Sequence, residues 1–146
     1  MAEMLRRINS IKQDHPTIFL VTEPLVRLNK TAFPPKNTFS MKGRTRFRAC
    51  IVAFNVHAWV VPEFTNLDMV TIVLQNENTM YYFVSLYCDI NEGLNQLLIK
   101  LVDHCNTNNH HLVIGADSNA HSQFWGSKMN NARGDMFEEF IMTKNL

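Results

Sequence analysis

The sequence predicts an α/β domain with a mixed β-sheet, and three observations support this prediction. The chain has 146 residues, the length of one ordinary domain or of a piece of a larger one. Its residues are 46% apolar and 18% charged, which provides for a hydrophobic core and excludes disordered and fibrous proteins. Segments with helical spacing alternate with short apolar runs, a pattern typical of sheets flanked by helices.

The first elements follow from the spacing of apolar residues. Residues 3–13 have apolar side chains at helical intervals and predict a short amphipathic helix, which Pro16 ends. Residues 17–21 form an apolar run and predict a strand that leads directly into residues 22–24, Thr-Glu-Pro. Residues 25–48 are polar and basic and contain two consecutive prolines, so a long irregular loop is expected there.

Runs rich in β-branched and aromatic residues come next. They predict four short strands, at residues 49–54, 58–61, 69–74 and 81–88. The last run is apolar almost throughout, as expected of a strand that is covered on both faces. These strands form the main part of the predicted sheet.

The clearest helix is predicted over residues 92–105, where one unbroken apolar stripe repeats at helical spacing. Asn91 is the expected N-cap of this helix, and a polar turn is expected over residues 106–111. A further strand is predicted at residues 112–115 and a last helix at residues 133–143.

Basic residues are concentrated in one part of the chain, although the net charge is only +1. Between Pro24 and Pro62 there are seven Lys and Arg residues and no acid. Such a segment can bind a polyanionic ligand, and a solvated loop carries one nearly as often.

The cysteines and the apolar runs indicate the compartment. The three cysteines are far apart and form no C-x-x-C pair, so neither a disulfide framework nor a zinc ribbon is indicated. Each lies in an apolar run, and buried free thiols in a reducing compartment are expected. The N-terminus lacks the apolar core of a signal peptide, and no apolar run is long enough to span a bilayer. We therefore expect a soluble intracellular chain.

Polar side chains come at the ends of three predicted strands. Glu23 follows the first strand, Tyr87 closes another, and Asp117 follows a third, with Asn119 two residues further on the same side. Mg²⁺ prefers oxygen ligands and usually takes one or two carboxylates, while an amide or a phenol can bond a phosphate oxygen. Each residue also has a simpler interpretation, as a Glu-Pro turn, an Asx turn or a packed tyrosine with a solvated hydroxyl.

Several motifs occur together in a specific order. Residues 113–127 read V-I-G-A-D-S-N-A-H-S-Q-F-W-G-S, followed by A-R-G at 132–134 and F-E-E-F at 137–140. Upstream come T-E-P at 22–24, the W-x-x-P-E-F…D-M-V segment of 59–71 and V-S-L-Y at 84–87. Over nearly the whole chain this order resembles the endonuclease domain of arthropod-type non-LTR retrotransposons, in the endonuclease/exonuclease/phosphatase (DNase I-like) superfamily.

The resemblance implies a fold and an extent. The expected fold is a four-layer α/β sandwich, with mixed β-sheets flanked by helices. Residues 1–146 would be the N-terminal portion of the domain, because the family's first strand precedes Met1 and its last strands follow Leu146. Those last strands carry a closing Ser-Asp-His whose His is the general acid/base partner. Because loss of a positioned general base commonly costs about 10²–10⁴ in rate, we expect this chain to be a weak or inactive nuclease.

The resemblance also implies a role for each candidate residue. Glu23 would ligate a divalent cation, Mg²⁺ or Mn²⁺. Asp117 would orient and activate the attacking water, Asn119 would contact the scissile phosphate, and Tyr87 would bond a phosphate oxygen. Basic side chains of the long loop would lie near the DNA backbone: Lys42, Arg44, Arg46 and Arg48.

The function implied is metal-dependent nicking of a target DNA strand, so that its 3′ hydroxyl primes reverse transcription. The endonuclease would be fused to a reverse transcriptase in the parent polyprotein and would act in the nucleus, without a membrane. One alternative is a catalytically dead remnant of such an element that binds DNA or another partner. A second alternative is a sugar- or lipid-phosphatase of the same superfamily, which the W-G pair at 125–126 and the R-G pair at 133–134 argue against.

Overall fold

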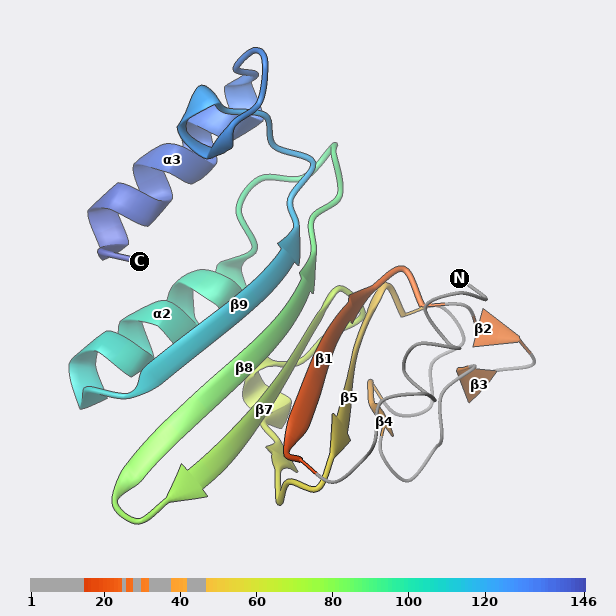
Figure 1. Ribbon diagram of the computed structural model, residues 1–146. Helices are drawn as coiled ribbons and strands as arrows, with labels where there is room; N and C mark the ends of the chain where they lie inside the picture. Colours follow the sequence, from red (N-terminus) through yellow and green to blue (C-terminus); the bar gives the residue numbers. More distant parts are fainter. Residues whose placement is uncertain (1–14, 25, 28–29, 32–37, 42–46) are drawn as a thin grey trace.

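The computed structural model describes residues 15–24, 26–27, 30–31, 38–41 and 47–146. Within these residues the chain forms two β-sheets, a short hairpin and two α-helices (Figure 1). The predicted α/β fold with a mixed sheet is therefore confirmed. The helix predicted at residues 3–13 lies outside the described residues.

The first sheet is antiparallel, with the strand order β1-β5-β4. Its strands are β1 (Thr17–Thr22), β4 (Thr38–Phe39) and β5 (Ala49–Phe54). β5 lies in the middle, and all of its residues are buried because both faces of the sheet are covered there. The segment expected as an irregular loop contains β4 and also a hairpin of β2 (Val26–Arg27) and β3 (Lys30–Thr31).

The second sheet has the order β6-β7-β8-β9. Its strands are β6 (Trp59–Val60), β7 (Met69–Asn76), β8 (Thr79–Tyr87) and β9 (His111–Asp117). β6, β7 and β8 pair antiparallel, whereas β9 lies parallel to β8 and therefore needs a crossover, which contains α2 (Gln96–Asn108). Short 3₁₀ turns lie at η2 (Pro62–Phe64) and η3 (Gln123–Trp125), and the last element is α3 (Ala132–Lys144).

The two sheets pack face to face, and α2 and α3 lie on the outer side of the second sheet (Figure 1). Between the sheets, Ala49 and Ile51 of β5 pack with Val70 and Ile72 of β7, and all four are buried. Because side chains alternate along a strand, the neighbours of these residues in β5 and β7 point to the outer faces of the two sheets. Beneath the helices the core contains Val84, Leu86, Leu98, Leu101, Val102, Phe137 and Phe140.

The start predicted for the helix after β8 is wrong. α2 begins only at Gln96, and its N-cap is Asn95, whose side chain accepts two backbone N–H groups of the first turn. Asn91 is instead engaged in a turn, in which both its backbone and its side-chain N–H groups donate to the Asp89 carboxylate. At the other end the helix extends into the predicted polar turn as far as Asn108, and its C-cap is Asn109, which has a left-handed backbone (φ 54°).

The predicted state of the cysteines is confirmed, since Cys50, Cys88 and Cys105 are all buried and free. Burial raises the pKa of the Cys50 thiol to about 12 and that of Cys105 to about 11. Both thiols therefore stay neutral at physiological pH and act as small core side chains. Among the described residues, no helix combines the length and the apolar character that crossing a membrane requires.

The close contact of β1 with β9 depends on Gly115. A Cβ at this position would lie 2.8 Å from Leu20 Cδ1 and 2.9 Å from Leu20 Cβ. We expect Gly115→Ala to push the sheets apart and to destabilise the domain by about 1–3 kcal/mol, measured by urea denaturation.

Gly93→Ala is the matched control, because a Cβ there would meet nothing within 4 Å. Its unfolding midpoint should equal or slightly exceed that of the unmodified chain. An unchanged midpoint in Gly115→Ala would contradict the close approach of β1 to β9.

Candidate active site

Three strands end at the same edge of the sandwich. Figure 1 shows the ends of β1, β8 and β9 at one end of the molecule. β8 and β9 are in parallel register, with Tyr87 directly opposite Asp117. β1 is joined to β8 by the buried hydroxyl of Ser85, which donates to the Val21 carbonyl at 2.9 Å. The residue that follows β1, Glu23, therefore comes to the edge where Tyr87 and Asp117 lie.

Tyr87 and Asp117 point toward the first sheet. Tyr87 lies two residues after Ser85, which contacts β1, and Asp117 lies two residues after Gly115, which also faces β1. Residues two apart on a strand share a face, so the phenol and the carboxylate lie next to each other. Both side chains are partly exposed, as a site that receives a substrate requires.

Asn119 connects the loops that follow β8 and β9. Its side-chain amide donates to the Cys88 carbonyl at 3.0 Å, and the backbone N–H of Cys88 donates to the Asp117 carbonyl at 2.9 Å. The backbone of Asn119 is left-handed (φ 51°), a conformation that Asn tolerates better than most residues. Because an amide has two N–H donors and an acceptor oxygen, one bond to Cys88 leaves capacity for a phosphate or a water.

Glu23 has an unusual backbone for its residue type. Its φ is 47°, in the left-handed region that non-glycine residues with longer side chains seldom adopt. Its N–H donates to the Arg48 carbonyl at 2.7 Å, which holds it at the end of β1, and its side chain is exposed. Such strained positions cluster at active sites.

Arg48 is bound between two carboxylates beside the candidate residues. Its Nε and Nη2 donate to the two oxygens of Asp68 at 2.5 and 2.7 Å, and its Nη1 donates to Asp89 at 2.5 Å. The guanidinium also lies 4.7 Å from the centre of the Tyr87 ring, which is cation–π distance. The structure thus places this predicted DNA-contacting residue in an ion-pair cluster, while Lys42, Arg44 and Arg46 lie outside the described residues.

Two contributors to this edge, Asp68 and Arg133, were given no role by the sequence. Asp68 lies in the D-M-V motif and Arg133 in the R-G motif, but the spacing of residues did not predict which group either side chain contacts. The Asp89 carboxylate accepts hydrogen bonds from Asn91 and also from Arg48. The partners of Arg48 lie 20 and 41 residues away in sequence, so only the folded chain identifies them.

The donor set at this edge fits a sparsely ligated hard cation. Glu23 and Asp117 would supply carboxylate oxygens, and within the described part of the chain no three His, Cys, Asp or Glu residues come together as a metal cage. Mg²⁺ is commonly held by one or two carboxylates together with waters and substrate phosphates, whereas structural zinc needs four closely placed ligands.

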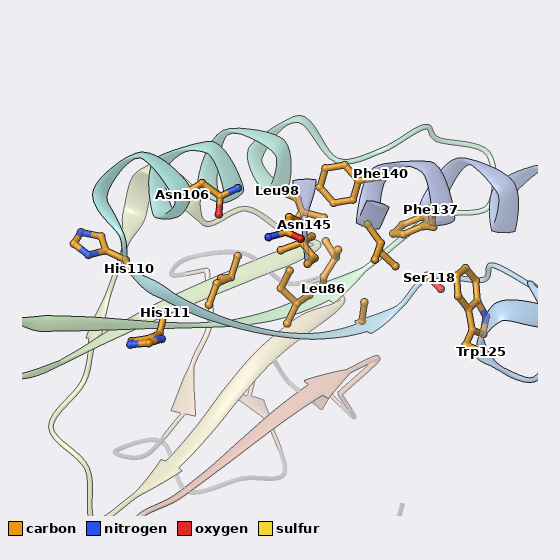
Figure 2. A pocket seen from close by; sticks show the side chains of 15 residues that line it. Leu86, Leu98, Asn106, His110, His111, Ser118, Trp125, Phe137, Phe140 and Asn145 are labelled. Carbon is orange, nitrogen blue, oxygen red and sulfur yellow. The ribbon is translucent and has the colours of Figure 1, made fainter. Parts of the chain in front are cut away.

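A groove of about 720 Å³ lies on the other side of β9, between that strand and the helices (Figure 2). Leu112, Ile114 and Ser118 line it from β9 and the residue after it, and Figure 2 shows Trp125 close to Ser118 at one end. These alternate with Gly115 and Asp117, which face the first sheet. The groove and the candidate catalytic residues are therefore on opposite faces of the same strand.

The strain at Glu23 gives a stability prediction. Glu23→Gly removes the steric cost of the left-handed backbone, whereas Glu23→Ala and Glu23→Gln keep it. We expect Glu23→Gly to be more stable than Glu23→Ala by about 1 kcal/mol in urea denaturation. A lower stability of the glycine variant would show that this backbone is not held in the left-handed region.

The Arg48 cluster predicts a pH dependence. The Asn91 N–H and the Arg48 guanidinium lower the pKa of Asp89 below its ordinary value of 3.8. A lowered carboxyl pKa stabilises the fold above the unfolded pKa, and this stability is lost as the pH falls through the folded pKa. In Arg48→Met, the Asp89 pKa measured by NMR titration should rise but stay below 3.8, because the Asn91 contact remains.

Arg48→Met should also destabilise the domain at neutral pH, and by more than Lys144→Met does, since it leaves Asp68 and Asp89 without their common partner. This loss should shrink as the pH falls below 4. Lys144→Met is the control, because it removes a more exposed ion pair with Asp103 and should cost under about 1 kcal/mol. Equal losses in the two variants would contradict a special role of the Arg48 cluster.

Two comparisons with known proteins bear on the family and the fold of this chain. Residues 81–146 match the sequence pattern of the family described as Endonuclease-reverse transcriptase. The structure resembles the endonuclease domain of TRAS1, a telomere-specific non-LTR retrotransposon, with a TM-score of 0.58 at 19% sequence identity. The alignment covers 87% of this chain and 52% of the TRAS1 domain, so the chain spans about half the length of that domain. No curated protein matches the chain.

The matched segment contains Tyr87, Asp117 and Asn119, and the structural likeness extends over most of the chain. Residues 81–146 thus carry the sequence pattern of the endonuclease-reverse transcriptase family, and the chain has the DNase I-like fold of a non-LTR retrotransposon endonuclease domain.

Proposed function

We propose that this chain is the N-terminal portion of a metal-dependent DNA endonuclease that nicks a target strand for reverse transcription. The observation that carries the proposal is the meeting of Tyr87 and Asp117 at the ends of two paired strands, with Glu23 on the adjoining strand. Asn119 is tied to the same edge through Cys88. An acid, a phenol and an amide at one partly exposed edge suit the hydrolysis of a phosphodiester.

Glu23 would hold Mg²⁺ or Mn²⁺ at this edge. When bound, the cation supplies Lewis acidity that stabilises charge on the phosphate oxygens. The exposed position of the Glu23 side chain leaves room for waters and a DNA phosphate to complete the coordination. The left-handed backbone would aim the side chain, at the cost of local strain.

Asp117 would orient the attacking water and accept its proton. Asn119 and Tyr87 would donate hydrogen bonds to the non-bridging oxygens, where negative charge increases in the transition state. The water oxygen bonds to phosphorus as the bond from phosphorus to O3′ breaks. The leaving O3′ takes a proton from solvent water, so the products are a 3′ hydroxyl, which can prime reverse transcription, and a 5′ phosphate.

The remaining assignments concern partners. The basic residues within 27–48 would lie near the DNA backbone and give salt-dependent, sequence-tolerant affinity. A reverse transcriptase domain would follow in the parent polyprotein, in keeping with the name of the matched family. Action on chromosomal DNA would place the protein in the nucleus.

A second function, DNA binding without cleavage, is favoured by one specific observation. The chain spans about half of the TRAS1 endonuclease domain, so residues outside the alignment contribute to that domain. We therefore propose that nicking by the 146-residue chain alone is slow. In the binding-only alternative, the chain would retain DNA in a salt-sensitive way and give no metal-dependent product.

A plasmid assay tests the proposal. We expect the chain to convert supercoiled plasmid slowly to the open circle in Mg²⁺ or Mn²⁺ and to stop in EDTA. Asp117→Ala should lower the rate by about 10²–10⁴, because it removes the group that positions the water. Glu23→Gln should raise the Mg²⁺ concentration needed for half-maximal rate.

Glu77→Gln serves as the control, because Glu77 lies in the turn between β7 and β8, at the opposite end of β8 from Tyr87. Its rate should equal that of the unmodified chain. Salt-sensitive DNA retention without any metal-dependent nick would reject the nuclease and support the binding module. A fast nick that Asp117→Ala abolishes would support the nuclease and reject the expectation that the chain is weak.

A further inference from the structure

Arg133 reaches from the first turn of α3 to both loops that carry the candidate residues. Its Nε donates to the Ser118 carbonyl at 2.6 Å, and its Nη1 donates to the Glu92 carbonyl at 2.6 Å. Ser118 is the residue between Asp117 and Asn119, and Glu92 belongs to the loop that follows β8. One side chain therefore connects the loops after two neighbouring strands.

The position of Arg133 is fixed by the close approach of α3 to the loop that follows Asn119. A Cβ on Gly134 would lie 1.8 Å from the His121 carbonyl oxygen, so only glycine fits there. Asn131 caps the helix with a side chain that accepts from Gly134 N at 2.6 Å and also from His121 N at 3.0 Å. The backbone thus holds the start of α3 against this loop.

Burial of the Arg133 guanidinium at this position costs free energy. Its Nη2 is buried and, within the described part of the chain, has no hydrogen-bond partner. An unpaired buried N–H is costly, and a residue with only a packing role would be better served by an apolar side chain. Arg133 also acts on Cys88, where it partly opposes the burial that raises the pKa of that thiol. Cys88 is the residue whose carbonyl accepts the Asn119 amide.

We propose that Arg133 is a positioning residue that sets the Asp117-Ser118-Asn119 turn relative to the loop after β8. The planar guanidinium donates in two fixed directions, so it can bridge the Ser118 and Glu92 carbonyls, which a lysine ammonium on a flexible stem cannot do with the same geometry. Displacement of the turn moves the Asn119 amide and the Asp117 carboxylate together. The catalytic consequence of this displacement rests on the proposed function, whereas the positioning itself does not.

The first measurement is kinetic and uses Arg133→Lys, which keeps the charge. We expect kcat for plasmid nicking to fall about 10- to 100-fold with KM within about twofold, since small misplacements of catalytic groups have effects of this size. Lys144→Met is the control, because it removes the Lys144–Asp103 ion pair at the far end of the same helix. Its kcat should stay within about twofold of the unmodified chain.

The second measurement does not depend on activity. The side-chain amide resonances of Asn119, assigned by their loss in Asn119→Asp, should shift in Arg133→Lys and stay in place in Lys144→Met. If the Asn119 amide shifts but the unmodified chain shows no nicking, the proposed function fails and the positioning role stands. If Arg133→Lys lowers the melting temperature while the Asn119 resonances and kcat are unchanged, Arg133 is only structural and the proposal is overturned.

A third variant covers the case in which Arg133→Lys does not fold, as judged by its near-ultraviolet circular dichroism. Arg133→Gln has a planar amide that can donate to one carbonyl, so it keeps part of the anchoring of α3. It is then measured with the same two readouts. A shifted Asn119 amide supports the proposal, and unchanged Asn119 resonances overturn it.

Discussion

The contact of β1 with β8 and β9 is the constraint on which the rest of the structure depends. Gly115 has no side chain where Leu20 approaches, and Ser85 buries its hydroxyl by donating to the Val21 carbonyl. An unpaired hydroxyl between two apolar sheets would be costly, so this bond fixes how β1 lies over β8. The ends of the three strands then coincide, and the candidate residues meet because of that register.

Two arginines hold the resulting edge by different means. Arg48 uses charge, because its guanidinium bridges Asp68 and Asp89 while its face lies over Tyr87. Arg133 acts through directional hydrogen bonds, because its partners are the neutral backbone carbonyls of Ser118 and Glu92. The Arg48 pairs are partly exposed and therefore respond to pH and salt, whereas the geometry of the Arg133 bonds depends on the packing of α3.

The Arg48 ion pairs also bear on the net charge of this edge. The charge of Arg48 is compensated by two carboxylates, so Arg48 orders Tyr87 more than it attracts DNA. In the proposed function, attraction of the polyanion would fall to other basic residues, and the few carboxylates at this edge would leave room for a phosphate. The apolar groove under α3 takes no part, because it lies on the opposite face of β9.

The sequence by itself determined the longer strands and the polar residues at their ends, but not the short strands β2, β3 and β4. Alternation and β-branched runs located β5, β7, β8 and β9, and the acids, phenol and amide that follow strands marked Glu23, Tyr87, Asp117 and Asn119. The N-cap of α2 was harder to predict, because Asn91 and Asn95 are the same residue type within one loop. Only the folded distance to Asp89 and to the helix N–H groups separates their roles.

The tertiary structure alone decided which of these residues act together. Arg48 was expected to be a DNA contact because nothing local indicated Asp68 or Asp89 as its partners. Arg133 carried no assigned role because its acceptors are backbone carbonyls, which every residue has and no sequence pattern marks. The sequence specifies the chemistry of each side chain. Which distant groups pair depends on the strand register and on two close approaches, which Gly115 and Gly134 permit.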